Sequence, residues 1–174
     1  FLYQTERVYL KDIYIKPSYA AKDSVGNLNV IVKVGGQNRE SIGHSINICI
    51  LNQNGDAISQ GEVEAIIGKS AFYPIIGKGA KLSLSWPAIP VAPWSAETPN
   101  LYTAVVKLIS PHGNVIERTE LNFGFRDIQV KDKELLINDK PVLIKGVNRH
   151  EHNDITGRVL TKESIRAELF LMKQ

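Results

Sequence analysis

Between residues 8 and 130 the chain consists of short runs in which apolar and polar residues alternate, and each run ends at a turn sequence. In the run at 29–34, for example, Val30, Val32 and Val34 share one face. A period of two fits a β-strand and excludes an amphipathic helix, whose period is 3.6. The pattern predicts about seven strands in two antiparallel sheets packed face to face. We therefore expect a mainly β fold, an immunoglobulin-like antiparallel β-sandwich.

The alternation and the turns between the runs set the expected strand bounds. One segment at 86–94 interrupts the pattern, because it carries three prolines between Trp86 and Trp94. Proline lacks a backbone donor, so we expect this segment to be a covering segment or crossover rather than a central strand. We expect the two tryptophans to pack in a core or interface rather than stack on a sugar. The strands are expected at 8–15, 29–34, 45–51, 61–67, 80–86, 101–109 and 115–123.

Composition excludes several classes of partner. The 174 residues include 21 Lys and Arg and 18 Asp and Glu, a net charge of +3. So small a charge gives no electrostatic case for nucleic acid or an anionic membrane, and no apolar run approaches the roughly 18 residues of a membrane helix. The single cysteine, Cys49, excludes an internal disulfide framework. Its neighbours Ile48 and Ile50 indicate a buried structural thiol.

Residues 131–174 differ from the region before them. Apolar runs at 134–137 and 142–144 flank a turn at 138–140, which predicts a hairpin whose second arm continues to 148. Thr161 is then a good N-cap for an amphipathic helix, with Glu168 and Lys173 facing out. A strand, a loop and a helix form one βα unit, the first piece of a larger α/β domain.

The expected domains are therefore a sandwich at 1–130 and the start of a truncated (β/α)8 barrel at 131–174. The chain begins at Phe1 rather than Met and ends at Gln174 inside an apolar-periodic helix. We expect it to be a fragment of a longer protein, with sequence missing on both sides. The compartment, cytoplasm or periplasm, stays open.

A polar cluster at 146–154, GVNRHEHND, directly follows the last predicted strand. Residues at the carboxyl end of a barrel strand line the active site, and imidazole, amide and carboxylate groups hydrogen-bond to sugar hydroxyls. A solvated loop is the plain alternative. His150 and His152 offer two zinc ligands but no evident third. Glu151 and Asp154 are a weak pair for glycoside hydrolysis, which needs two carboxylates across the scissile bond.

Three motifs together resemble glycoside hydrolase family 2: WSAETPNLY at 94–102, FGFR at 123–126 and LINDKPVLIKGVNRHEH at 136–152. The NRHEH form is most similar to the β-galactosidase branch, as are the Gly-Arg pair at 157–158 and the helix end LMKQ at 171–174. The resemblance implies a jelly roll, then this sandwich, then a catalytic barrel, in a bacterial enzyme. It also implies a retaining mechanism whose two glutamates lie beyond position 174, so this fragment carries no catalytic residue and is expected to be inactive alone.

The resemblance also implies roles for individual residues. His150 matches the histidine that reaches the bound galactosyl group, and Asn148, Arg149 and Glu151 match residues that frame that pocket. Implied partners are a β-galactoside, the missing jelly-roll and barrel domains and further subunits of a homo-oligomer. The parent enzyme is expected to use Mg²⁺ and Na⁺, with no metal ligand among these residues. Two alternatives stay open: a carbohydrate-binding or adhesion sandwich, and a β-glucuronidase or β-mannosidase.

Overall fold

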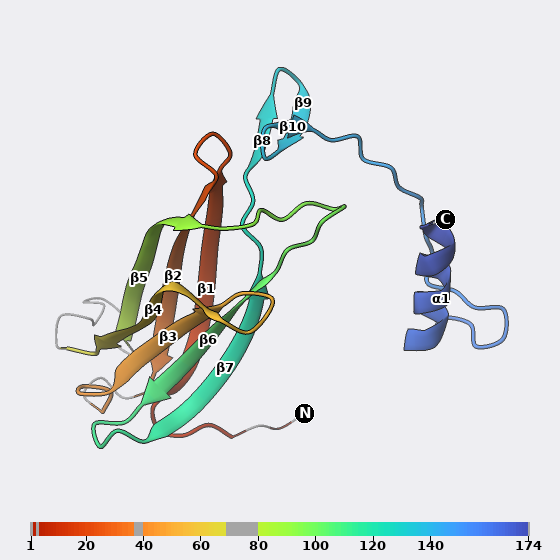
Figure 1. Cartoon of the computed structure of the whole chain (residues 1–174). Helices are drawn as coiled ribbons and strands as arrows, with labels where there is room; N and C mark the ends of the chain where they lie inside the picture. The colour runs from red at the N-terminus through yellow and green to blue at the C-terminus, as the bar shows by residue number, and fades with distance from the viewer. Residues whose placement is uncertain (1, 3, 37–39, 69–79, 174) are drawn as a thin grey trace. The chain divides into compact units, whose positions relative to one another are not determined.

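A computed structural model describes residues 2, 4–36, 40–68 and 80–173 of the chain (Figure 1). It divides into two compact units, Phe1–Val142 and Leu143–Gln174, each of which is described by itself. The boundary between these compact units lies after Val142. The predicted domain boundary at 130 remains a prediction.

The first unit contains two antiparallel sheets that form a sandwich, so the predicted mainly β, immunoglobulin-like architecture is confirmed (Figure 1). The sheet order β1-β2-β5 defines one layer, and the order β4-β3-β6-β7 defines the other. The first layer consists of β1 (Tyr9–Ala20), β2 (Val25–Gly35) and β5 (Ala80–Pro90). The second consists of β3 (Ser45–Leu51), β4 (Ala57–Ile66), β6 (Tyr102–Ile109) and β7 (Val115–Phe123).

The core lies between the two layers and is built from the alternating positions that the sequence marked. Val30 and Val32 of β2 and Ile46 and Ile48 of β3 are all fully buried. Each such side chain stabilises the fold by about 1.5–3 kcal/mol through its removal from water. Trp86 is also fully buried, as predicted. The hydrophobic effect across this interface therefore holds the two layers together.

The proline-rich segment differs from its prediction, because 86–90 is the end of strand β5 rather than a crossover. The prolines are tolerated since β5 lies at one edge of its sheet, where a missing donor leaves no neighbour unpaired. The register shifts here, with Pro87 and Ala88 of β5 opposite Asn27 of β2. The Ala88 N–H donates to Asn27 Oδ1 at 3.0 Å, so a side chain replaces the missing ladder bond.

Two smaller expectations were also wrong. Strand β1 continues past Pro17, which pairs with Leu28 of β2, because β1 is the other edge of the same sheet. Cys49 is half-buried rather than buried, since it lies between the core positions Ile48 and Ile50 of β3 and points to the opposite face of the sheet. Position on an edge or on one face of a sheet is a tertiary property that a local pattern does not contain.

A small three-stranded sheet of order β10-β9-β8 completes the first unit. Both of its turns have positive φ at two successive residues, 50° and 69° at Asp132 and Lys133, and 53° and 62° at Asn138 and Asp139. This is the backbone of a two-residue type I′ hairpin turn, which Asn and Asp tolerate. The strands are β8 (Ile128–Lys131), β9 (Glu134–Ile137) and β10 (Lys140–Pro141).

The predicted second hairpin arm at 142–144 is wrong in extent, because β10 ends at Pro141. The Val142 N–H still donates to the Leu135 carbonyl at 2.9 Å, but Leu143 and Ile144 are exposed. A parallel barrel strand takes its hydrogen bonds from neighbouring barrel strands. Among the described residues, no strand pairs with 143–144.

The second unit contains a loop and helix α1 (Lys162–Met172), which confirms the predicted helix. Thr161 is its N-cap, with Thr161 Oγ1 accepting from the Ser164 N–H at 3.1 Å. Apolar residues of α1 such as Phe170 and Leu171 are 66% and 71% exposed, so this helix presents an uncovered apolar surface. The described residues contain no helix long and apolar enough to cross a membrane.

Candidate functional site

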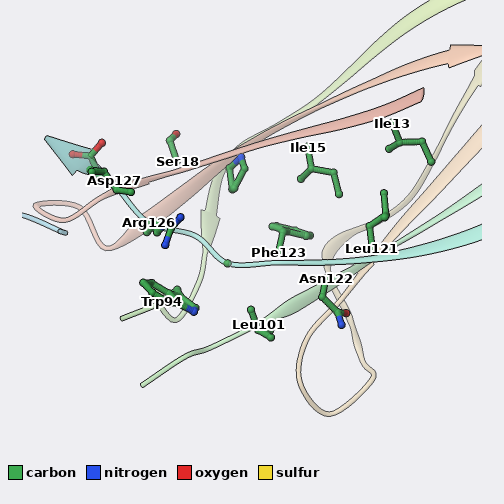
Figure 2. Close-up of a pocket in the computed structure, with 13 residues that line it drawn as sticks. Ile13, Ile15, Ser18, Trp94, Leu101, Leu121, Asn122, Phe123, Arg126 and Asp127 are labelled. Atoms are coloured by element: carbon green, nitrogen blue, oxygen red, sulfur yellow. The ribbon is translucent and has the colours of Figure 1, made fainter. Parts of the chain in front are cut away.

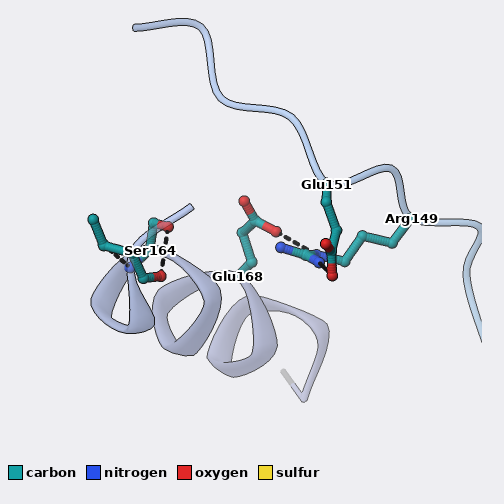
Figure 3. A network of polar contacts seen from close by, with 5 residues as sticks. Arg149, Glu151, Ser164 and Glu168 are labelled. Atoms are coloured by element: carbon teal, nitrogen blue, oxygen red, sulfur yellow. Dashed lines mark hydrogen bonds and ion pairs between the residues drawn. The ribbon is translucent and has the colours of Figure 1, made fainter. Parts of the chain in front are cut away.

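The polar loop before α1 is centred on Arg149, whose guanidinium reaches the helix (Figure 3). Arg149 Nε donates to Glu168 Oε2 at 2.7 Å, and Arg149 Nη1 lies 3.7 Å from Glu151 Oε1. The Arg149 side chain is 22% exposed, against 39% for Glu168 and 76% for Glu151. The loop is therefore fastened to α1 mainly through Glu168.

Glu168 was expected to face out, and its side chain is 39% exposed, but it also pairs with Arg149. Sequence reasoning missed this partner because the two residues are nineteen positions apart. The pair contributes little to stability, since ion pairs with this much exposure contribute about 0.2–1 kcal/mol. Its main effect is on geometry, because it fixes the side chain that immediately precedes His150.

The other predicted substrate-binding residues lie on the surface of this unit. Asn148, His150 and Glu151 are exposed, and the His150 carbonyl accepts from the His152 N–H at 2.9 Å. The structure thus brings Arg149 and Glu151 together and leaves the His150 imidazole open to solvent. Among the described residues no three or more His, Cys, Asp or Glu side chains gather as metal ligands.

The end of the loop is closed by a turn around Asn153. Asn153 Oδ1 accepts from the Ile155 and Thr156 N–H groups at 2.9 and 3.0 Å. Backbone bonds of 2.7 and 2.9 Å join Asn153 and Gly157, where φ is 65°. Asn often forms such a side-chain turn, so the Asn-to-Gly spacing is a signal that sequence reasoning could have used.

A groove of about 790 Å³ lies on the sandwich and is lined by residues of β1, β7 and the 94–101 segment (Figure 2). Its lining includes Ile15, Phe123, Trp94 and Arg126. Arg126 Cζ lies 4.6 Å from the centroid of the Trp94 ring. Because the guanidinium covers that ring face, Trp94 packs within the protein rather than offering this face to a sugar.

Comparison with known proteins identifies the family. The sequence model of glycosyl hydrolases family 2 matches residues 8–126. The chain belongs to glycosyl hydrolase family 2. The model of the family's TIM barrel domain matches residues 128–174, which include the polar loop and α1. The sandwich and the start of the barrel are therefore both family 2 segments.

Curated proteins similar to this chain include two bacterial β-galactosidases. The chain is 31% identical over 175 residues to the β-galactosidase of Streptococcus thermophilus, covering 100% of this chain and 15% of that protein. It is 51% identical over 81 residues to the β-galactosidase of Photobacterium profundum, covering 47% of this chain and 8% of that protein. The chain thus spans a small part of these relatives.

Solved structures with a similar fold include two β-glucuronidases. β-Glucuronidase 3 of Bacteroides uniformis matches with a TM-score of 0.70 and 23% identity, over 96% of this chain and 19% of that chain. The β-glucuronidase of Bifidobacterium dentium, complexed with coumarin-3-O-glucuronide, matches with a TM-score of 0.71 and 24% identity, over 95% of this chain and 26% of that chain. Identities this low show the shared fold alone.

Proposed function

We propose that this chain is the sandwich and opening barrel segment of a β-galactosidase that releases terminal non-reducing β-D-galactose with retention of configuration. The observation that carries the proposal is the identity to curated β-galactosidases, 31% over the full chain and 51% over 81 residues. The β-glucuronidase structures share the fold at 23–24% identity, which gives no support for a glucuronide substrate.

Retention requires two carboxylates about 5–5.5 Å apart, one acid/base and one nucleophile. We assign neither role within this chain. Glu151 is 76% exposed and its Oε1 lies 3.7 Å from Arg149 Nη1, so we propose a structural role for this carboxylate rather than a catalytic one. The two glutamates are therefore proposed to lie outside these 174 residues, and the isolated chain is proposed to be inactive.

His150 is the residue proposed to contact the sugar. Its imidazole is exposed on a loop within 128–174, the residues that match the family's TIM barrel domain. In TIM barrels, active sites form from the loops that follow the strands. Asn148, Arg149 and Glu151 flank it and are proposed to frame the same pocket. Mg²⁺ and Na⁺ in the parent enzyme, and assembly of that enzyme into a homo-oligomer, also stay proposals, and no described residue is assigned to either.

Aryl glycosides test the proposed substrate. The parent enzyme should hydrolyse 4-nitrophenyl β-D-galactoside faster than the matching β-D-glucuronide and β-D-mannoside. The 174-residue chain should release no nitrophenol from any of them. A parent enzyme that prefers the glucuronide or mannoside contradicts galactose specificity but keeps the family. A parent protein that binds glycans without hydrolysing them supports the alternative of a binding or adhesion sandwich.

A further inference from the structure

We propose that Glu168 of α1 is a positioning residue for His150 and acts through Arg149. The proposal rests on the proposed function, because it concerns how the residue assigned to the sugar is held. Nothing in the sequence pattern assigned a role to Glu168 beyond a solvent-facing position on the helix. The structure instead places its carboxylate on the guanidinium next to His150 (Figure 3).

Glu168 is the main partner of the Arg149 guanidinium. At 2.7 Å the bond from Arg149 Nε to Glu168 Oε2 has the length of a charge-assisted hydrogen bond. The contact to Glu151 is longer, 3.7 Å, and Glu151 is 76% exposed. Glu168 therefore determines where the guanidinium lies, and Glu151 is a secondary neighbour.

The backbone connects this ion pair directly to His150. Arg149 and His150 are adjacent, so a fixed Arg149 side chain restricts the backbone from which the His150 imidazole projects. The loop after His150 is fastened separately by the Asn153–Gly157 turn. The N-cap at Thr161 stabilises the start of α1, the helix that carries Glu168. His150 thus lies between two fixed points, one of which is the ion pair.

The geometry of the pair depends on the arginine side chain. Arginine presents a planar set of donors to a carboxylate, whereas lysine presents a single flexible charge. A misplacement of about 1 Å in a substrate-contacting group can lower a rate by about 100-fold. Loss of the pair is therefore expected to affect turnover of the galactoside through His150 and to leave the fold intact.

The test is a double-mutant cycle in the parent enzyme with 4-nitrophenyl β-D-galactoside. Glu168→Gln should lower kcat/KM by about 10- to 100-fold. In a His150→Ala background, the same change should lower kcat/KM by less than about 2-fold, because residues that act together are not additive. Arg166→Gln, an exposed charge on the same helix, serves as the matched control and should leave kcat/KM within about 2-fold of wild type.

A second variant keeps the test decisive if Glu168→Gln perturbs folding. Glu168→Asp keeps a carboxylate for Arg149 and should retain more of the wild-type kcat/KM than Glu168→Gln. Full additivity of Glu168→Gln with His150→Ala, or equal losses in Glu168→Asp and Glu168→Gln, overturns the positioning role alone. If His150→Ala is as active as wild type, the assignment of His150 under the proposed function fails instead.

Discussion

Asn138 joins the small sheet to the sandwich, and substitutions at this position can remove its stabilising contributions one at a time. Its Oδ1 accepts from the Asp127 N–H at 2.9 Å, and its Nδ2 donates to the Trp94 carbonyl at 3.0 Å. Its φ of 53° lies in the left-handed region. Each side-chain bond contributes about 1 kcal/mol, and a left-handed backbone costs an ordinary residue about 1–2 kcal/mol. We therefore expect Asn138→Ala to lower the free energy of local opening by about 3–4 kcal/mol.

Two further substitutions at the same position separate these contributions. Asn138→Gly keeps the backbone freedom and loses both side-chain bonds, so it should cost about 2 kcal/mol. Asn138→Asp keeps the acceptor and tolerance of positive φ but cannot donate to the Trp94 carbonyl, so it should cost about 1 kcal/mol. The expected order of stability is Asn, Asp, Gly, Ala.

Native-state hydrogen exchange of the 174-residue chain measures these costs directly. Amides that pair β8 with β9 should exchange about 100-fold or more faster in Asn138→Ala, since each 1.4 kcal/mol is a factor of ten. Amides that pair β3 with β6 should keep their wild-type rates. Asp139→Asn is the matched control, because φ of 62° suits either residue. Equal protection in the Ala and Asp variants would refute the reasoning.

Two other predictions follow from close contacts. Gly124→Ala would place a Cβ 2.8 Å from Trp94 Cβ, so it should lower the free energy of unfolding by about 1–3 kcal/mol in urea titrations. At Gly146 an added Cβ would meet no atom within 4 Å, so Gly146→Ala should leave the free energy of unfolding unchanged. The hydrogen bond and charge of Lys33, 2.7 Å away, lower the pKa of Asp12 below its usual 3.8. The stabilisation from this interaction is fully present above pH 3.8 and is lost as the pH falls through the lowered pKa of Asp12. The difference in free energy of unfolding between wild type and Asp12→Asn should therefore vanish in acid. A difference that stays constant with pH would contradict this prediction.

Local patterns predicted much of the sandwich because its strands bury one face. The bounds of β3 and β7 agree with the predicted runs at 45–51 and 115–123. The Thr161 N-cap was also predictable, because a capping side chain acts on its own helix. The passage of β5 through Pro87 was not, since only the assembled sheet makes β5 an edge.

The candidate site was less predictable than the fold. A polar run after an apolar segment located the loop, and the family resemblance named His150 within it. Neither indicated that Arg149 contacts Glu168, because the partner lies on a separate element and the contact forms only when loop and helix meet. The expected strand at 142–144 would need hydrogen bonds from neighbouring strands, and the described residues place no strand beside it.

The most direct test of the central claim is the structure of the parent enzyme with a galactose-configured inhibitor bound. We expect a ring nitrogen of His150 within about 3.2 Å of a hydroxyl of the galactosyl ring, which is hydrogen-bond distance. We also expect Arg149 to remain bound to Glu168 in that complex. A sugar bound with the His150 imidazole directed away from it and beyond hydrogen-bond reach would contradict the claim.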